Sequence, residues 1–178
     1  MIEKKFLIRE MKKTEYNELE NFLYEAIFIP ENVLPPPREI IFQPELQVYI
    51  KNFGEGEADF CFVAEIDKKI VGAAWSRIMN DYGHIDEKTP SLALSVLKNF
   101  RRQGIATDLM KNLIEKIFAN NFQQISLSVQ KNNFIAIELY KKLGFKIFRE
   151  IDEEFIMILK LREKNVDTDK FGTSTGRM

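Results

Sequence analysis

The distribution of apolar and polar positions predicts the order of the secondary structure elements along the chain. Apolar runs rich in β-branched and aromatic residues, several alternating with polar ones, predict strands at residues 6–11, 60–66, 70–79, 92–97, 125–129, 145–151 and 155–161. Apolar residues at helical spacing predict helices at residues 14–27, 105–118 and 133–143. Pro44 suits the first turn of a further short helix at residues 44–52. Strands and helices are therefore interspersed, as in an α/β or α+β domain.

The breaks between these runs carry residues typical of caps and turns. Thr14 is the expected N-cap of the first helix, and Gly144 is the expected left-handed stop of the last one. The polar residues 67–69 predict a hairpin between two strands. The proline-rich residues 28–43 predict a long ordered loop. Within that loop we favour a stiff connector over a ligand for a proline-binding domain.

The length and charge of the chain narrow the classes of function. A chain of 178 residues suits one domain with a real core, which we expect at residues 1–162, followed by a polar and mobile tail at 163–178. Lys and Arg number 26 and Asp and Glu 27, so the net charge is -1. This balance predicts no nucleic-acid partner and no membrane partner, although it leaves a local basic patch open.

The single cysteine and the N-terminus bear on compartment and reactivity. Cys61 lies in an apolar run, so we expect a buried structural thiol rather than a reactive one. One cysteine allows neither an internal disulfide nor a cysteine metal cluster, and no metal is expected. No apolar run reaches about 18 residues, and no signal-peptide core is present, so we expect a cytoplasmic protein.

One turn carries the first chemical signal. The pattern Arg101-x-x-Gly104-x-Ala106 places small residues where a strand ends and a helix begins. A helix N-terminus offers unpaired N–H groups and the positive end of a dipole, and both suit a phosphate. Taken alone, the pattern fits an ordinary strand-to-helix turn equally well.

A second motif follows one strand later, and the pair resembles the Gcn5-related N-acetyltransferase (GNAT) family. The family's Gln/Arg-x-x-Gly-x-Gly/Ala motif is matched at Arg101, Gly104 and Ala106. Its Asn-x-x-Ala-x-x-Leu-Tyr-x-x-x-Gly-Phe motif is matched at Asn133, Ala136, Leu139, Tyr140, Gly144 and Phe145. The resemblance covers nearly the whole chain, from residue 6 to residue 161.

The resemblance implies a fold and an activity. The implied fold is a single domain with a central mixed, mostly antiparallel sheet of about seven strands, splayed central strands and about four flanking helices. The implied activity is that of an acyltransferase, an N-acetyltransferase that uses acetyl-CoA as co-substrate. The acceptor is a small-molecule or peptide amine, and the protein is expected to be a monomer or homodimer. The alternative is a catalytically silent acyl-CoA-binding sensor of the same fold.

The resemblance also implies roles for individual residues. The backbone of Leu94, Ser95 and Val96 resembles the strand edge that pairs with the pantetheine arm, and it can supply an N–H donor to the oxyanion. Asn133 resembles a residue that hydrogen-bonds the pantetheine side. The residues that resemble the pyrophosphate turn, counted from the end of the strand, are Arg101, Arg102, Gln103, Gly104, Ile105, Ala106 and Thr107.

Tyr140 is the expected general acid for the leaving thiolate, because its phenol has a pKa of about 10. On helical spacing alone a core aromatic is the better interpretation of Tyr140, and the motif reverses that preference. The acceptor amine must lose a proton, but the sequence does not identify the base. Five carboxylates lie in or beside the predicted loops: Glu25, Glu31, Glu39, Asp81 and Asp86. They either attract a cationic acceptor or are simply solvated.

Four positions depart from the family pattern. Relatives often carry Pro-Glu at Lys98-Asn99 and glycine at Arg102. We expect the turn to tolerate both departures because neither position is expected to need a positive φ, and Arg102 can add a contact to phosphate. Peptide-acetylating relatives can carry a glutamate base at the position of Ser128. A serine cannot replace it, so the base lies elsewhere.

Overall fold

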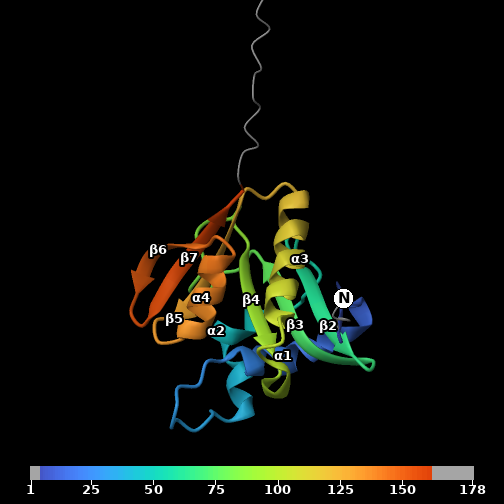
Figure 1. Cartoon of the computed structure of the whole chain (residues 1–178). Coiled ribbons are helices and arrows are strands. Elements are labelled where there is room, and N and C mark those ends of the chain that lie inside the picture. The colour runs from blue at the N-terminus through green and yellow to red at the C-terminus, as the bar shows by residue number, and fades with distance from the viewer. Residues whose placement is uncertain (1–4, 162–178) are drawn as a thin grey trace, which may run out of the picture.

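Seven strands form one sheet in the order β1-β2-β3-β4-β5-β7-β6 (Figure 1). The structure is a computed structural model that describes residues 5–161, so the predicted tail at 163–178 lies outside the described residues. The strands are β1 Leu7–Glu10, β2 Phe60–Ile66, β3 Lys69–Arg77, β4 Ser91–Val96, β5 Gln124–Gln130, β6 Lys146–Ile151 and β7 Glu154–Lys160. Only β4 and β5 pair in parallel. The predicted mixed, mostly antiparallel sheet of seven strands is confirmed.

The described residues contain four α-helices, as predicted: α1 Leu19–Ala26, α2 Pro44–Gln47, α3 Ile105–Ala119 and α4 Phe134–Lys142. Short 3-10 segments occur at Lys13–Glu18, Arg38–Phe42 and Lys98–Phe100. No helix in this part of the chain has the length and apolar character that crossing a bilayer requires.

The predicted N-cap at Thr14 is wrong. The first helical segment begins at Lys13, so Thr14 lies inside it. The carboxylate of Glu15 satisfies this terminus instead, accepting a hydrogen bond from the backbone N–H of Lys12 at 2.9 Å. Glu15 also accepts from Arg9 of β1 at 2.8 Å, which ties the terminus to the sheet. A carboxylate held by a guanidinium is a stronger acceptor than a threonine hydroxyl.

Two hydrophobic clusters lie on opposite faces of the sheet, because successive strand residues point to opposite sides. On β3, Ala74 belongs to the cluster beneath α3 and α4, whereas Ala73 and Trp75 belong to the cluster beneath α1. Figure 1 shows α3 and α4 crossing one face. The thiol of Cys61 is buried in the α1 cluster, as predicted, and burial raises its pKa.

The sheet opens at its centre. The pairing between β4 and β5 is limited to Ser91 opposite Ser126. On its other side, β4 pairs with β3 along its whole length, from Ser91 to Val96. The two central strands therefore diverge towards the carboxyl end of β4, and the predicted splay is confirmed. We refer to this opening as the strand gap.

An ion pair anchors the segment after α2 to the end of β3. The guanidinium of Arg77 contacts the carboxylate of Asp59 at 3.0 Å and donates hydrogen bonds to the carbonyls of Val48 and Lys51 at 3.1 and 2.8 Å. Only 1% of the Asp59 side chain and 11% of the Arg77 side chain are exposed. A buried pair of this kind is costly to break because it leaves one charge uncompensated.

We therefore expect Asp59→Ala to lower the free energy of unfolding by about 3 kcal/mol. Glu138→Gln is the matched control because Glu138 pairs with Lys141 at 3.6 Å and both side chains are more than half exposed. That control should cost about 0–1 kcal/mol. Urea denaturation of the two variants measures the difference, and equal midpoints would contradict the anchoring role of Asp59.

Candidate functional site

The turn between β4 and α3 presents an open helix N-terminus. Gly104 is the N-cap residue, with φ 83°, and no side chain caps the helix. The first helical hydrogen bond runs from the N–H of Asp108 to the carbonyl of Gly104 at 3.1 Å, so the earlier N–H groups have no acceptor within the helix. A Cβ built on Gly104 meets nothing within 4 Å. The space in front of this positive end is open to an anion.

Arginine side chains and backbone shape the turn itself. The Nε of Arg101 donates to the carbonyl of Val96 at 2.8 Å, which ties the turn to the end of β4. Arg102, Gln103 and Gly104 are exposed. This arrangement brings the predicted turn residues together at the mouth of the strand gap.

The expectation that Arg102 needs no positive φ is wrong. Arg102 has φ 61°, in the left-handed region, and Gly104 has a positive φ two residues later. The chain reverses between the end of β4 and the axis of α3 within these few residues. A non-glycine residue in this region costs on the order of 1 kcal/mol. The expectation holds for Lys98 and Asn99, which have no positive φ.

The predicted strand edge borders the strand gap. Leu94 and Val96 pack with the cluster beneath α3, while Ser95 points to the α1 face. The hydroxyl of Ser95 is buried and has no hydrogen-bond partner. Beyond Ser91, the backbone of β4 has no strand partner on the side of β5. Its N–H and C=O groups on that side are free to pair with an extended ligand.

Tyr140 lies near the end of α4 and is 7% exposed. Its ring packs edge-on against Phe145 with the ring centroids 5.9 Å apart. Burial raises the pKa of Tyr140 to about 12. The phenol is therefore protonated at neutral pH and can serve as a proton donor.

Asn133 has a structural function in the same motif. Its side-chain oxygen accepts a hydrogen bond from the N–H of Ala136 at 3.3 Å, so Asn133 is the N-cap of α4. Gly144, with φ 97°, follows the end of the helix as predicted. The motif therefore positions Tyr140 by capping α4 at one end and terminating it at the other.

A polar cluster occupies the α1 face at the start of the strand gap. The carboxylate of Asp81 accepts from the hydroxyl of Ser91 at 2.8 Å and from the phenol of Tyr49 at 3.0 Å. The Ser91 hydroxyl also lies 3.1 Å from that of Ser126 on β5. Burial raises the pKa of Asp81 and, more strongly, that of Tyr49. The indole of Trp75 fixes this arrangement by donating to the carbonyl of Tyr49 at 3.1 Å.

Glu154, a residue that the sequence reasoning passed over, extends this cluster. It is the first residue of β7 and lies opposite Gln130 of β5. Burial raises the pKa of Glu154, while hydrogen bonds to Ser128 and Gln130 offset part of the increase and Asp81 adds to it. Its Oε2 atom is buried without a hydrogen-bond partner. The sequence contained a signal for this position. Side chains alternate between the two faces along β7, so with Phe155 on the α3 face, the preceding residue Glu154 faces the α1 side.

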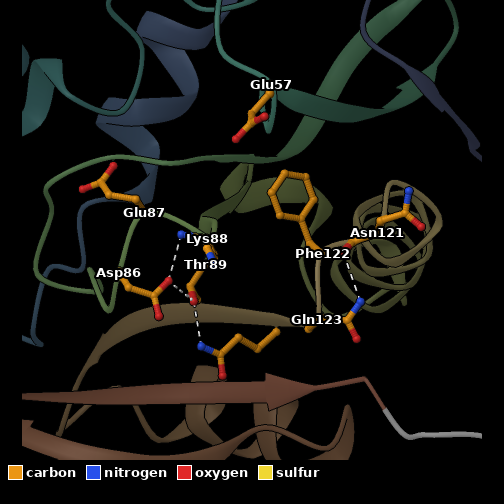
Figure 2. Close-up of a pocket in the computed structure, with 9 residues that line it drawn as sticks. Glu57, Asp86, Glu87, Lys88, Thr89, Asn121, Phe122 and Gln123 are labelled. Carbon is orange, nitrogen blue, oxygen red and sulfur yellow. Dashed lines mark hydrogen bonds between the residues drawn. The ribbon is translucent and has the colours of Figure 1, made fainter.

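The other predicted loop carboxylates lie outside the cluster. Asp86 accepts from the N–H of Lys88 and the hydroxyl of Thr89, both at 2.8 Å, and these bonds lower the pKa of Asp86. Figure 2 shows Asp86 at a separate hollow, with Glu57 across it. Asp86 therefore stabilises its own loop. Of the remaining predicted carboxylates, two are exposed and one is half-buried: Glu31, Glu39 and Glu25.

The described residues offer no preformed metal site, because no group of three His, Cys, Asp or Glu side chains is arranged to hold an ion. The strand gap is bordered by unpaired backbone groups of β4, with carboxyl groups on the α1 face and the phenol of Tyr140 on the α4 face. These groups suit acyl transfer, which needs a proton donor, a proton acceptor and a donor to the oxyanion.

Comparison with known proteins places these features in one family. A model of the acetyltransferase (GNAT) family matches residues 22–145. The N-alpha-acetyltransferase of Sulfurisphaera tokodaii is 28% identical over 152 residues, which are 80% of this chain and 81% of that protein. The N-alpha-acetyltransferase of Saccharolobus solfataricus is 37% identical over 93 residues, 48% of this chain and 55% of that protein.

Solved structures have the same fold. The PaiA N-acetyltransferase from Thermoplasma acidophilum, crystallised in complex with coenzyme A, superimposes with a TM-score of 0.66 at 17% identity. The match covers 88% of this chain and 99% of that one.

Proposed function

This chain belongs to the acetyltransferase (GNAT) family, and we propose that it transfers acetyl from acetyl-CoA to a primary amine by direct attack in a ternary complex. The observation that carries the proposal is the open N-terminus of α3 at the mouth of the strand gap. One end of this site suits a pyrophosphate, and the other end holds proton donors and acceptors.

The turn residues 101–107 would hold the pyrophosphate of coenzyme A. The N–H groups of Ile105, Ala106 and Thr107 have no acceptor within the helix, and the open space at Gly104 lets an anion approach them. The backbone of residues 94–96 would pair with the pantetheine arm and supply an N–H to the developing oxyanion. When bound, acetyl-CoA supplies the activated acyl group, and the chain supplies its orientation.

Tyr140 would protonate the leaving thiolate. Its raised pKa keeps the phenol protonated at neutral pH, and its place on α4 puts it on the opposite face of the sheet from Asp81 and Glu154. A covalent acyl-cysteine step is unnecessary in this scheme. The one thiol, Cys61, is buried in the α1 cluster, and burial raises its pKa, which disfavours the nucleophilic thiolate.

A peptide α-amine is the acceptor that we favour, because several relatives are N-alpha-acetyltransferases. An α-amine has a pKa of about 7.7–8.0, so a modest base suffices to make it nucleophilic. A small-molecule amine is the alternative acceptor. Ser128, at a position where relatives can carry a base, instead favours the alternative function of a silent acyl-CoA sensor. The cytoplasmic location and the monomeric or homodimeric state stay predictions.

A thiol-release assay tests the function directly. We expect acetyl-CoA to yield free coenzyme A thiol with a peptide that has a free N-terminus and not with the same peptide acetylated at its N-terminus. Polyamines, aminoglycosides and free amino acids complete the panel of acceptors. Cys61 should contribute little background to a thiol reagent because it is buried. If the protein binds acetyl-CoA but releases no coenzyme A thiol with any of the acceptors, the sensor function is favoured.

Gly104→Glu should abolish acetyl-CoA binding measured by calorimetry, because it places bulk and negative charge where the pyrophosphate would lie. The fold should survive, because the space at Gly104 is open and the positive φ of 83° costs a residue with a side chain on the order of 1 kcal/mol. Lys111→Glu is the matched control, an exposed position on the same helix two turns further along. Affinity retained in the Gly104 variant would contradict the assignment of the turn.

Tyr140→Phe should lower the single-turnover rate by about 10²-fold, the contribution expected of a general acid. The affinity for acetyl-CoA should change little. Tyr16→Phe is the control, because Tyr16 is also a tyrosine whose pKa is raised by burial, but it packs against Phe53 in the other cluster. If both variants turn over at the wild-type rate, Tyr140 is a core aromatic only.

A further inference from the structure

Two buried side-chain oxygen atoms in residues 5–161 lack a hydrogen-bond partner, one at the edge of the strand gap and the other one strand beyond it. They are Oγ of Ser95 and Oε2 of Glu154. Ser95 is on β4 and Glu154 on β7, so they lie on opposite sides of β5 in the strand order. Buried polar atoms are nearly always paired in folded proteins. Two exceptions on one face of the sheet, on either side of β5, indicate polar groups that water or a ligand completes.

The strands that border the gap provide no base of their own. On the α1 face, β4 presents Ser91, Ala93 and Ser95, and β5 presents Ser126 and Ser128. A serine hydroxyl does not accept a proton near neutral pH. An ammonium acceptor that enters this face must therefore give its proton to a neighbouring element. Asp81 and Glu154 are the two carboxyl groups of the polar cluster.

Hydrogen-bond occupancy distinguishes these two carboxyl groups. In Asp81, Oδ1 accepts from Ser91 and Oδ2 accepts from Tyr49, so both oxygens are engaged. Glu154 keeps Oε2 without a partner. The register of β5 and β7 places Glu154 opposite Gln130, so its diagonal neighbour on the same face is Ser128, the residue of β5 two places beyond the last contact with β4. Glu154 therefore has one carboxyl oxygen without a hydrogen-bond partner, and Ser128 on β5 lies between Glu154 and the strand gap.

We propose that Glu154, reached through the hydroxyl of Ser128, is the base that takes a proton from the ammonium of the acceptor. This role rests on the proposed function. The amine then attacks the thioester carbonyl to form the C–N bond of a tetrahedral intermediate, and the C–S bond breaks when that intermediate collapses. The first proton passes from Glu154 to solvent. The second proton, lost from nitrogen on collapse of the intermediate, replaces the one that Tyr140 gives to the thiolate.

The surroundings of Glu154 suit this role. Tyr49, after α2, and Asp81, between β3 and β4, are the titratable groups that face it. The nearby cations are engaged elsewhere: Lys131 contacts Glu150 at 3.0 Å, and Arg149 donates to the carbonyl of His84 at 2.8 Å. Burial and the charge of Asp81 therefore act on the pKa of Glu154 without a cation to oppose them. A pKa above that of an ordinary glutamate brings the carboxylate closer to the amine in proton affinity.

Glu154→Gln tests the proposal, with thiol release by a peptide α-amine as the assay. We expect kcat/KM to fall by about 10²-fold or more, as for the loss of a general base. In the wild type, kcat/KM should rise across the pKa of Glu154 and again across that of the α-amine, at about 7.7–8.0. The variant should lose the first rise and keep the second.

Glu153→Gln is the matched control, the same substitution at the adjacent exposed residue. It should keep the wild-type rate and both rises. Both variants should keep the wild-type affinity for acetyl-CoA in calorimetry. The melting temperature of Glu154→Gln should not fall, because folding raises the pKa of the Glu154 carboxyl group, which destabilises the folded state at neutral pH.

The outcomes separate the two claims. A Glu154→Gln protein with the rate and pH profile of Glu153→Gln would overturn the role of Glu154 and leave the acetyltransferase activity standing. Loss of rate together with loss of the first rise supports the role. Loss of rate with both rises kept would overturn it in favour of a purely structural contribution. A wild type that binds acetyl-CoA and acetylates nothing would overturn the proposed function and this role with it.

Discussion

The site depends on the divergence of two parallel strands after a single pair of residues. Ser91 and Ser126 hold β4 and β5 together at one end, and beyond them the backbone of β4 keeps unpaired polar groups on one side. Unpaired backbone groups are costly in a protein interior, so the strand gap is stable only where solvent or a ligand reaches it. A ligand in the opening can contact groups on both faces of the sheet. A donor on the α4 face and acceptors on the α1 face can then serve one reacting centre.

The two faces divide the chemistry between them. Tyr140 belongs to the apolar cluster beneath α3 and α4, where burial keeps the phenol protonated. Asp81 and Glu154 belong to a polar cluster on the other face, where burial raises the pKa of both carboxyl groups and the charge of Asp81 adds to the rise at Glu154. Groups whose pKa values are shifted by different surroundings can act as acid and base at one pH. The helix N-terminus at Gly104 adds a fixed positive end that none of these proton transfers consumes.

Local patterns in the sequence were enough to predict much of this arrangement. The strand-turn-helix pattern around Gly104 and the helix that begins near Asn133 and stops at Gly144 depend on neighbours a few residues apart, and both appear as predicted. Three features depended on distant contacts. Arg102 takes a positive φ because packing elsewhere fixes the directions of the strand and of the helix axis. Arg9 of β1 holds the Glu15 carboxylate in place, so that Glu15 rather than Thr14 satisfies the start of the first helical segment. Glu154 gains its place in the cluster only through the pairing of β7 with β5.

The sole tryptophan of the chain has a consequence for experiment. Trp75 is fully buried in β3, and its indole N–H is held by the carbonyl of Tyr49, whose phenol in turn contacts Asp81. Indole emission depends on the polarity and hydrogen bonding of the ring. The protein therefore contains a single indole fluorophore beside its five tyrosines, and that indole is hydrogen-bonded to the residue that contacts Asp81. Movement of the segment after α2 would change its emission, so acceptor binding can be followed without a label.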